Sequence, residues 1–285
     1  MNSAKKHILN FLLSLIVFSL IFLIFTPYFT TDFLDIRQER ENEENYQKFL
    51  REEALRKIKE AEDKIYLTGK FDPSQREDFI LIPPEYTIDQ MDQYQLYLRK
   101  ETYTAYLQMQ SVASFDKIDL KIASATRNFD YQKELWDNQW TGITIIDGKN
   151  LLKSIPDELE RFKKILEYSA VPGTSRHHWG TDIDINNANL TYFRSSEGKK
   201  VYAWLVKNAP LFGFCQTYNS RGNIRSTGYN EEKWHWSYLP LAKDFTKRYK
   251  ELIKEEDLKG FLGDEYVSSV DLINNYVLAI NPDCI

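Results

Sequence analysis

The stretch SRHHWGTDID, residues 175–184, contains two of the four histidines in the chain, and a second stretch, EKWH at residues 232–235, contains a third. Gly180 allows the chain to turn sharply after the histidines, and the alternation of aspartate and isoleucine from Asp182 onward is typical of a strand. A histidine on the turn and a carboxylate on the strand can therefore converge. With His235 they would give two imidazoles and one carboxylate, a set with which catalytic zinc sites leave a fourth position open. The two stretches thus predict one zinc site with His177, Asp184 and His235 as ligands.

Composition narrows the possible classes of protein. A chain of 285 residues that is 42% hydrophobic and 14% aromatic can bury a substantial core. Its formal net charge of -5, without a basic stripe, gives no reason to expect a nucleic-acid partner. The sequence has no His-Glu-x-x-His run, no glycine-rich phosphate loop and no Cys-x-x-Cys pair. These absences argue against a zinc protease with a His-Glu-x-x-His helix, a phosphate-binding loop and a Cys-x-x-Cys site.

The N-terminal segment predicts a membrane anchor or an export signal. Two lysines and a histidine precede an uncharged stretch, Ile8–Thr31, whose apolar centre is long enough to cross a bilayer, and the residues that follow are mostly acidic. This order of charges places the rest of the chain outside the cytoplasm. Because Phe25–Tyr28 is bulky, a signal peptidase site is not evident, which favours an uncleaved anchor over a removed signal peptide. We therefore expect a single-pass protein of the cytoplasmic (inner) membrane with its domain on the periplasmic or extracellular side; the alternative is secretion to the periplasm after cleavage.

Three regions follow from this pattern. Residues 1–31 form the anchor or signal peptide, residues 32–66 a charged helical stalk, and residues 67–285 the globular domain. The stalk prediction rests on apolar residues at three-and-four spacing, such as Tyr46, Phe49 and Leu50, which indicate an amphipathic helix.

The domain mixes helix and strand patterns. Alternation predicts a strand at Ile118–Ile122, Asn128 can cap a following helix, and another helix is predicted over Met91–Met109, where it would carry Arg99. A helix at residues 199–208 precedes a strand at residues 212–218. Strands and helices do not alternate regularly, so the pattern predicts an α+β domain instead of a doubly wound sheet.

Two cysteines, Cys215 and Cys284, leave their pairing open. Outside the cytoplasm they could form a disulfide, and otherwise they are two separate buried thiols.

Three segments together resemble one family. They are SATRNFDYQ at residues 124–132, the stretch at residues 175–184, and EKWH at residues 232–235. Their order and spacing are similar to those of VanY-type D-alanyl-D-alanine carboxypeptidases, zinc metallopeptidases related to lysostaphin and to hedgehog zinc domains. The resemblance covers Leu67–Tyr249. It implies a small antiparallel sheet flanked by helices, with Zn²⁺ held by the three ligands predicted above.

The resemblance also implies roles for four further residues. Glu232 is the expected catalytic base; Glu231 is the competing choice, but the family pattern selects Glu232. Arg127 would bind the terminal carboxylate of the substrate, as a guanidinium can with two parallel hydrogen bonds. Gln132 and Ser175 match positions in the substrate cleft.

One residue, Asp182, departs from the commoner alanine of the family pattern. Strand alternation places it on the same face as Asp184. It is either a partner for a ligand histidine or an exposed acid.

The chemistry suits hydrolysis of an amide, because zinc lowers the pKa of bound water from about 15.7 to about 7. The expected function is removal of the terminal D-alanine from peptidoglycan stem peptides. Three alternatives remain open. They are an L,D-carboxypeptidase or an endopeptidase on the same scaffold, and a non-catalytic wall-binding module with a structural zinc.

Overall fold

The computed structural model describes the backbone of residues 3–88 and 95–285, and the side chains of these residues except at 3–5, 8–9, 12 and 27–34. The chain divides into two compact units, Met1–Lys59 and Glu60–Ile285. A 65-residue helix, α1 (Ser3–Leu67), begins in the first unit and ends in the second. The boundaries expected at residues 31 and 66 stay predictions.

The predicted transmembrane helix is wrong. A helix that spans a bilayer needs about 20 consecutive apolar residues. Within the residues that the structure describes, no helix supplies an apolar run long enough to cross a membrane. The membrane contact expected through residues 1–31 therefore has no support.

The described residues of the larger unit form two small antiparallel sheets. The four-stranded sheet has the order β3 (Ile122–Ser124), β4 (Asp182–Ile185), β6 (His235–Tyr238) and β5 (Phe214–Gln216). In its centre Asp184 lies opposite His235, and Asp182 lies opposite Ser237. The second sheet pairs β1 (Phe79–Leu81) with β2 (Tyr97–Arg99).

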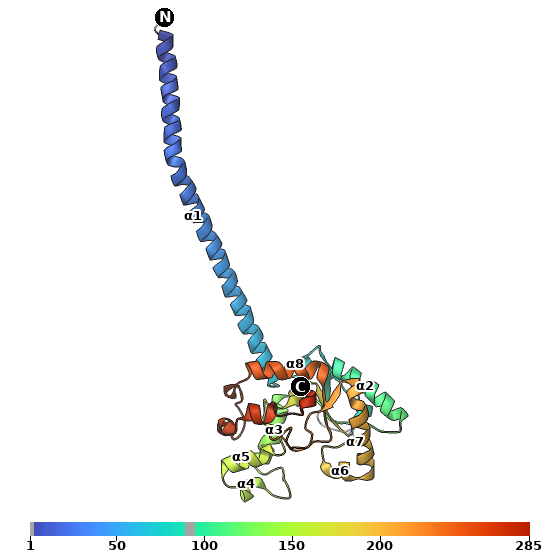
Figure 1. Ribbon diagram of the computed structural model, residues 1–285. Helices are drawn as coiled ribbons and strands as arrows, with labels where there is room; N and C mark the ends of the chain where they lie inside the picture. The colour runs from blue at the N-terminus through green and yellow to red at the C-terminus, as the bar shows by residue number, and fades with distance from the viewer. Residues whose placement is uncertain (1–2, 89–94) are drawn as a thin grey trace. The chain divides into compact units, whose positions relative to one another are not determined.

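Helices surround the four-stranded sheet. In Figure 1, α3, α4 and α5 gather on one side of the larger unit and α6 and α7 on the other. The α-helices of this unit after α1 are α2 (Lys100–Phe115), α3 (Phe129–Trp140), α4 (Leu151–Ser154), α5 (Glu158–Leu166), α6 (Leu190–Arg194), α7 (Ser196–Asn208) and α8 (Leu239–Leu252). The 3-10 helices are η1 (Pro73–Gln75), η2 (Pro84–Tyr86), η3 (Arg176–Trp179), η4 (Ala209–Phe212), η5 (Glu255–Asp257), η6 (Asp264–Ser269) and η8 (Pro282–Cys284), and η7 (Ile273–Val277) is a π-helix.

Two predicted elements differ from the observed ones. Arg99 ends strand β2 and does not lie within a helix, because Tyr97–Arg99 pairs with β1; residues 91–94 of the predicted helix lie outside the described residues. The strand predicted at Ile118–Ile122 begins only at Ile122, where pairing with Ile185 of β4 starts. The expected cap is confirmed: the Asn128 side chain accepts a hydrogen bond from the backbone N–H of Tyr131, 2.9 Å away.

Alternation along the central strands gives the sheet one apolar and one polar face. Ile183 of β4 and Trp236 of β6 pack in a buried hydrophobic cluster with residues of α2 and α7. Because successive side chains of a strand point to opposite faces, Asp182, Asp184 and His235 share the other face. The fold therefore brings acids and a histidine together on one side of a rigid sheet.

A disulfide between Cys215 of β5 and Cys284 holds the C-terminal segment against the domain. Within this segment Leu272, Val277 and Ile280 are buried. Closing a loop of this length contributes about 4 kcal/mol in the chain-entropy estimate. The cysteine pairing that the sequence left open is thus a disulfide.

Candidate metal centre

Three buried side chains from three elements converge on one point. His177 lies on η3, Asp184 on β4 and His235 at the start of β6. Asp184 Oδ1 is 3.4 Å from His177 Nε2 and 3.3 Å from His235 Nδ1. The three side chains each offer a ligand atom, and these atoms all lie within 4.8 Å of one another. The structure therefore brings together the three ligands that the sequence predicts.

Local backbone geometry places His177. Gly180 ends η3 in the left-handed conformation, with φ of 71°. A Cβ at this position would lie 2.5 Å from a ring carbon of Phe79, so the turn requires glycine. The Nδ1 atom of His177 lies 2.7 Å from the carbonyl oxygen of Ala125. Since a carbonyl only accepts, Nδ1 carries the hydrogen and the lone pair of Nε2 faces the centre.

His235 is held by the opposite ring nitrogen. Its Nε2 lies 2.8 Å from Asp182 Oδ2, which leaves Nδ1 directed at Asp184. Histidines that bind metals usually donate their second ring N–H to a carboxylate or a carbonyl group. Both histidines of this site have such a partner.

Two atoms of the cluster suit a bound cation. His177 Nε2 and Asp184 Oδ1 are buried, and neither makes a hydrogen bond with any residue that the structure describes. Buried polar atoms without a partner are uncommon and call for an explanation. A metal ion between these atoms would satisfy both.

The electrostatics of the cluster also favour positive charge. Burial alone would raise the pKa of Asp184, but the two histidines hold it well below its usual range. Burial would lower the pKa of His235, yet Asp182 and Asp184 outweigh this effect and raise it to about 9. A metal ion would compete with that proton, because a ligand histidine must be neutral.

Glu232 lies beside the ligands. Its Oε2 is 3.4 Å from His235 Nδ1, and burial raises its pKa to about 7. A carboxylate with a pKa near the working pH is suited to general base catalysis. Glu231 instead accepts a hydrogen bond from the Ser220 hydroxyl, 2.9 Å away. The geometry therefore favours Glu232 over its neighbour.

A pocket of about 50 Å³ opens onto these groups. Arg127 and Ser175 line it together with His177, Glu232 and His235. Its remaining lining residues are Tyr168, Ser169, Ala170, Arg176, Tyr218 and Tyr229.

The three predicted substrate-binding residues are placed differently. Arg127 Nη2 lies 3.8 Å from Asp184 Oδ2, at the edge of the ligand cluster, and Ser175 is buried in the pocket wall. Gln132 is fully buried outside the lining, and its Nε2 donates to the carbonyl oxygen of Ala170, 2.8 Å away. Gln132 thus supports the backbone segment that forms one wall of the pocket.

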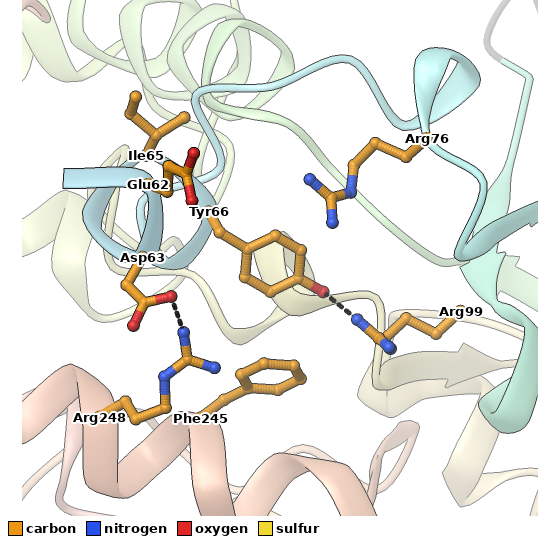
Figure 2. Close-up of a pocket in the computed structure, with 8 residues that line it drawn as sticks. All are labelled: Glu62, Asp63, Ile65, Tyr66, Arg76, Arg99, Phe245 and Arg248. Carbon is orange, nitrogen blue, oxygen red and sulfur yellow. Dashed lines mark hydrogen bonds and ion pairs between the residues drawn. The ribbon is translucent and has the colours of Figure 1, made fainter. Parts of the chain in front are cut away.

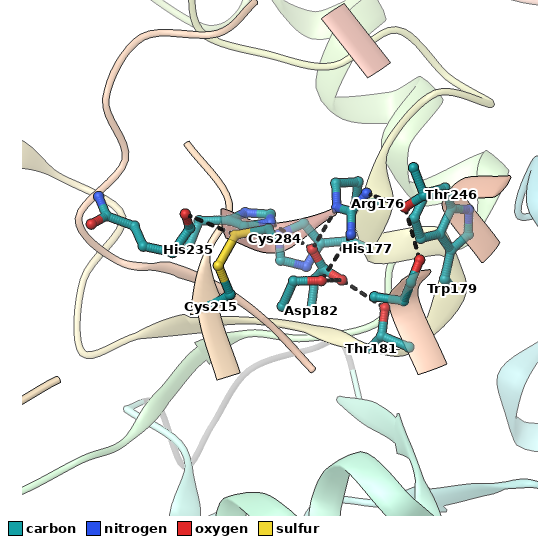
Figure 3. A network of polar contacts seen from close by, with 12 residues as sticks. Arg176, His177, Trp179, Thr181, Asp182, Cys215, His235, Thr246 and Cys284 are labelled. Atoms are coloured by element: carbon teal, nitrogen blue, oxygen red, sulfur yellow. Dashed lines mark hydrogen bonds and ion pairs between the residues drawn. A yellow bond between two sulfur atoms is a disulfide. The ribbon is translucent and has the colours of Figure 1, made fainter. Parts of the chain in front are cut away.

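The sequence did not identify most residues that line the smaller pocket, nor Arg176 as the partner of Asp182. Tyr168, Ser169 and Tyr218 lie in no recognisable motif, and Arg176 was passed over although it stands between Ser175 and His177. Arg176 contacts Asp182, as Figure 3 shows. Of the two interpretations of Asp182, the partner of a ligand histidine is the one observed, because this carboxylate is fully buried.

A larger pocket of about 500 Å³ lies elsewhere in the unit (Figure 2). It contains none of the metal-site residues. Arg248 pairs with Asp63 near the end of α1, and Arg99 donates to the hydroxyl of Tyr66 and to Asp78. The Arg248–Asp63 ion pair and the Arg99–Tyr66 hydrogen bond link the end of α1 to α8 and β2, and we assign the pocket a structural role.

The sequence of this chain is similar to those of known carboxypeptidases. Residues 95–241, more than half of the chain, match the sequence model of the VanY family, D-alanyl-D-alanine carboxypeptidase. A D-alanyl-D-alanine carboxypeptidase of Enterococcus faecalis is 36% identical over 89 residues, which are 31% of each chain. YodJ of Bacillus subtilis, named as a candidate carboxypeptidase, is 26% identical over 198 residues, or 67% of this chain and 61% of YodJ. The chain therefore covers less than two thirds of the length of either relative.

Solved structures show a looser likeness. A mutant of the vancomycin-resistance D,D-pentapeptidase VanY in complex with Zn(II) is 25% identical and has a TM-score of 0.42, covering 63% of this chain and 94% of that one. The LD-carboxypeptidase LdcB is also 25% identical, with a TM-score of 0.44 over 66% of this chain and 79% of that one.

Proposed function

Because this chain belongs to the VanY family of D-alanyl-D-alanine carboxypeptidases, we propose that it is a zinc carboxypeptidase that removes the terminal D-alanine from peptidoglycan stem peptides. The observation that carries the proposal is the convergence of His177, Asp184 and His235 beside Glu232, with two buried ligand atoms lacking hydrogen-bond partners among the described residues. Two imidazoles and one carboxylate form a donor set of catalytic zinc sites.

The ion would be held by His177 Nε2, His235 Nδ1 and a carboxylate oxygen of Asp184. When bound, zinc polarises a carbonyl and lowers the pKa of water to about 7. Glu232 takes a proton from the attacking water and delivers it to the departing amine. Its position next to His235, within the pocket, supports this role.

Arg127 fixes the carboxylate at the end of the substrate. Its side chain lines the pocket, and its Nε is buried without a hydrogen-bond partner in the described part of the chain. A guanidinium can hold a carboxylate by two parallel hydrogen bonds, which orient it as well as bind it. Ser175 contributes to the wall beside it, and Gln132 supports the wall at Ala170.

The domain acts outside the cytoplasm in this proposal. The disulfide between Cys215 and Cys284 supports an oxidising compartment, since cytoplasmic proteins keep most thiols reduced. Peptidoglycan stem peptides are exposed in that compartment.

Mass spectrometry of muropeptides incubated with the purified protein tests the function. We expect loss of one D-alanine from pentapeptides, abolished by a chelator and by Glu232→Gln. Glu231→Gln is the matched control, because Glu231 contacts Ser220 instead of the ligands, and it should keep its activity. Loss of the last residue only from tetrapeptides would indicate an L,D-carboxypeptidase, and cleavage of cross-links an endopeptidase. Zinc binding without any cleavage would indicate a wall-binding module.

A further inference from the structure

A buried polar network contacts His235 at Nε2, the ring nitrogen that does not face Asp184 (Figure 3). The proposed mechanism assigns this network no role. Its centre is Asp182, whose side chain is fully buried. One carboxylate oxygen, Oδ2, lies 2.8 Å from His235 Nε2 and accepts a hydrogen bond from Arg176 Nε at 3.2 Å. The other, Oδ1, accepts from the hydroxyls of Ser237 at 2.8 Å and Thr181 at 2.6 Å. Four donors therefore surround this carboxylate.

Arg176 closes the network on its far side. Its Nη2 donates to Ser237 Oγ and its Nη1 to Thr246 Oγ1 on α8, each at 2.9 Å. The guanidinium also lies over the ring of Trp179, 4.5 Å from the ring centre. All three guanidinium nitrogens thus have partners, and the charge of Arg176 balances that of Asp182.

This arrangement determines which nitrogen of His235 carries hydrogen. An ionised carboxylate can only accept hydrogen bonds, so Nε2 must be the donor toward Asp182. The lone pair of a neutral His235 is then on Nδ1, which faces Asp184 Oδ1 at 3.3 Å. The contacts of Nε2 with Asp182 and of Nδ1 with Asp184 together orient the ring. Strand pairing places Asp182 of β4 opposite Ser237, two residues beyond His235 on β6.

We propose that Asp182 is a positioning residue for the metal centre: it holds His235 in the orientation and tautomer that bind the ion, and Arg176 is its counter-charge. The inference rests on the metal site of the proposed function. Carboxylate partners of ligand histidines strengthen metal binding, and their removal weakens it by about 10- to 100-fold. Asp182→Ala should weaken zinc binding by this factor.

The test measures zinc affinity of the purified protein by competition with a chromophoric chelator. Asp182→Asn keeps an amide oxygen that can accept from Nε2, so its affinity should fall less than that of Asp182→Ala. The visible absorption spectrum of the cobalt-substituted protein should change in both variants, because it reports ligand geometry. Asp78→Ala is the matched control: it removes a carboxylate paired with Arg76 and Arg99, away from the metal site, and should leave zinc affinity unchanged.

Asp182→Ala also leaves Arg176 buried without its counter-charge, which could disturb folding. The double variant Arg176→Met with Asp182→Ala removes both charges, and circular dichroism shows whether it is folded. A positioning role predicts that the folded double variant still binds zinc 10- to 100-fold more weakly. Wild-type affinity in the double variant would overturn the inference and leave the proposed function intact. Failure of the wild-type protein to bind zinc at all would instead overturn the metal site, and the inference with it.

Discussion

Two pockets of the domain, the small one beside the metal site and the larger one near the end of α1, both contain arginines and differ in what their polar side chains contact. In the larger one, lined by Arg76, Arg99 and Arg248, the guanidiniums bind neighbouring carboxylates. At the smaller one, the lining residue His177 directs its Nε2 at Asp184 Oδ1, 3.4 Å away, and both atoms are buried without hydrogen-bond partners among the described residues. The larger cavity has about ten times the volume, about 500 Å³ against about 50 Å³. Because Arg99 Nε in the larger pocket also lacks a hydrogen-bond partner among the described residues, the difference teaches that the convergence of metal-ligating atoms marks the chemistry better than volume or a single unpaired atom does.

The largest expected effect comes from removing a ligand in the smaller pocket. His177→Ala should abolish zinc binding and reduce D-alanine release by more than the roughly 10⁴-fold that loss of a general base can cause. Metal analysis of the purified variant and a release assay measure both. Activity near that of the wild-type protein would contradict the assignment of the smaller pocket as the metal site.

Glu232→Gln should have the next largest effect. Loss of the general base should lower kcat by about 10² to 10⁴-fold. Zinc content should stay at the wild-type level, because Glu232 is not one of the ligands. Steady-state kinetics and metal analysis separate the two quantities, and a loss of zinc together with activity would argue that Glu232 is a ligand.

A pair of matched arginine substitutions sharpens the comparison. Arg127→Lys replaces a two-pronged donor with a point charge, and losing a charge-assisted hydrogen bond is worth about 1.5–3 kcal/mol. We therefore expect kcat/KM to fall by roughly 10- to 100-fold, mostly through KM. Arg248→Lys in the larger pocket should leave kcat/KM unchanged. An equal fall in kcat/KM in both variants would show that Arg127 supports the fold instead of binding the substrate.

The smallest effect belongs to the larger pocket itself. Asp63→Asn removes the carboxylate that pairs with Arg248, and both side chains are partly exposed. Such a pair contributes at most about 1 kcal/mol, which corresponds to a shift in Tm of about 2–4 °C for a domain of this size. Thermal denaturation measures the shift. A change in activity at constant Tm would give this pocket a function that its ion pairs do not suggest.

The sequence was informative where chemistry and local geometry coincide. The convergence of His177 and Asp184 could be predicted because Gly180 marks a turn and the alternation of Asp182 with Ile183 marks a strand, so the direction of each side chain follows from local pattern. The roles predicted for Glu232, Arg127, Gln132 and Ser175 stay predictions, although three of them line the same pocket.

Features built from distant segments could not be predicted in the same way. Thr246 reaches Arg176 from α8, and Tyr168 reaches the pocket after α5, so only tertiary packing brings them there. Arg99 falls within the helix predicted over Met91–Met109, but long-range pairing with β1 makes it a strand residue. The transmembrane prediction relied on a local apolar run and the charges on either side of it, and it did not hold for the described residues.

Adding zinc back to the chelator-stripped protein tests the central claim most directly. D-alanine release from a pentapeptide is followed as zinc is added in steps below one equivalent. The account predicts no release without metal and a linear rise that stops at one equivalent. Release by the stripped protein, or a rise that does not depend on zinc, would contradict it.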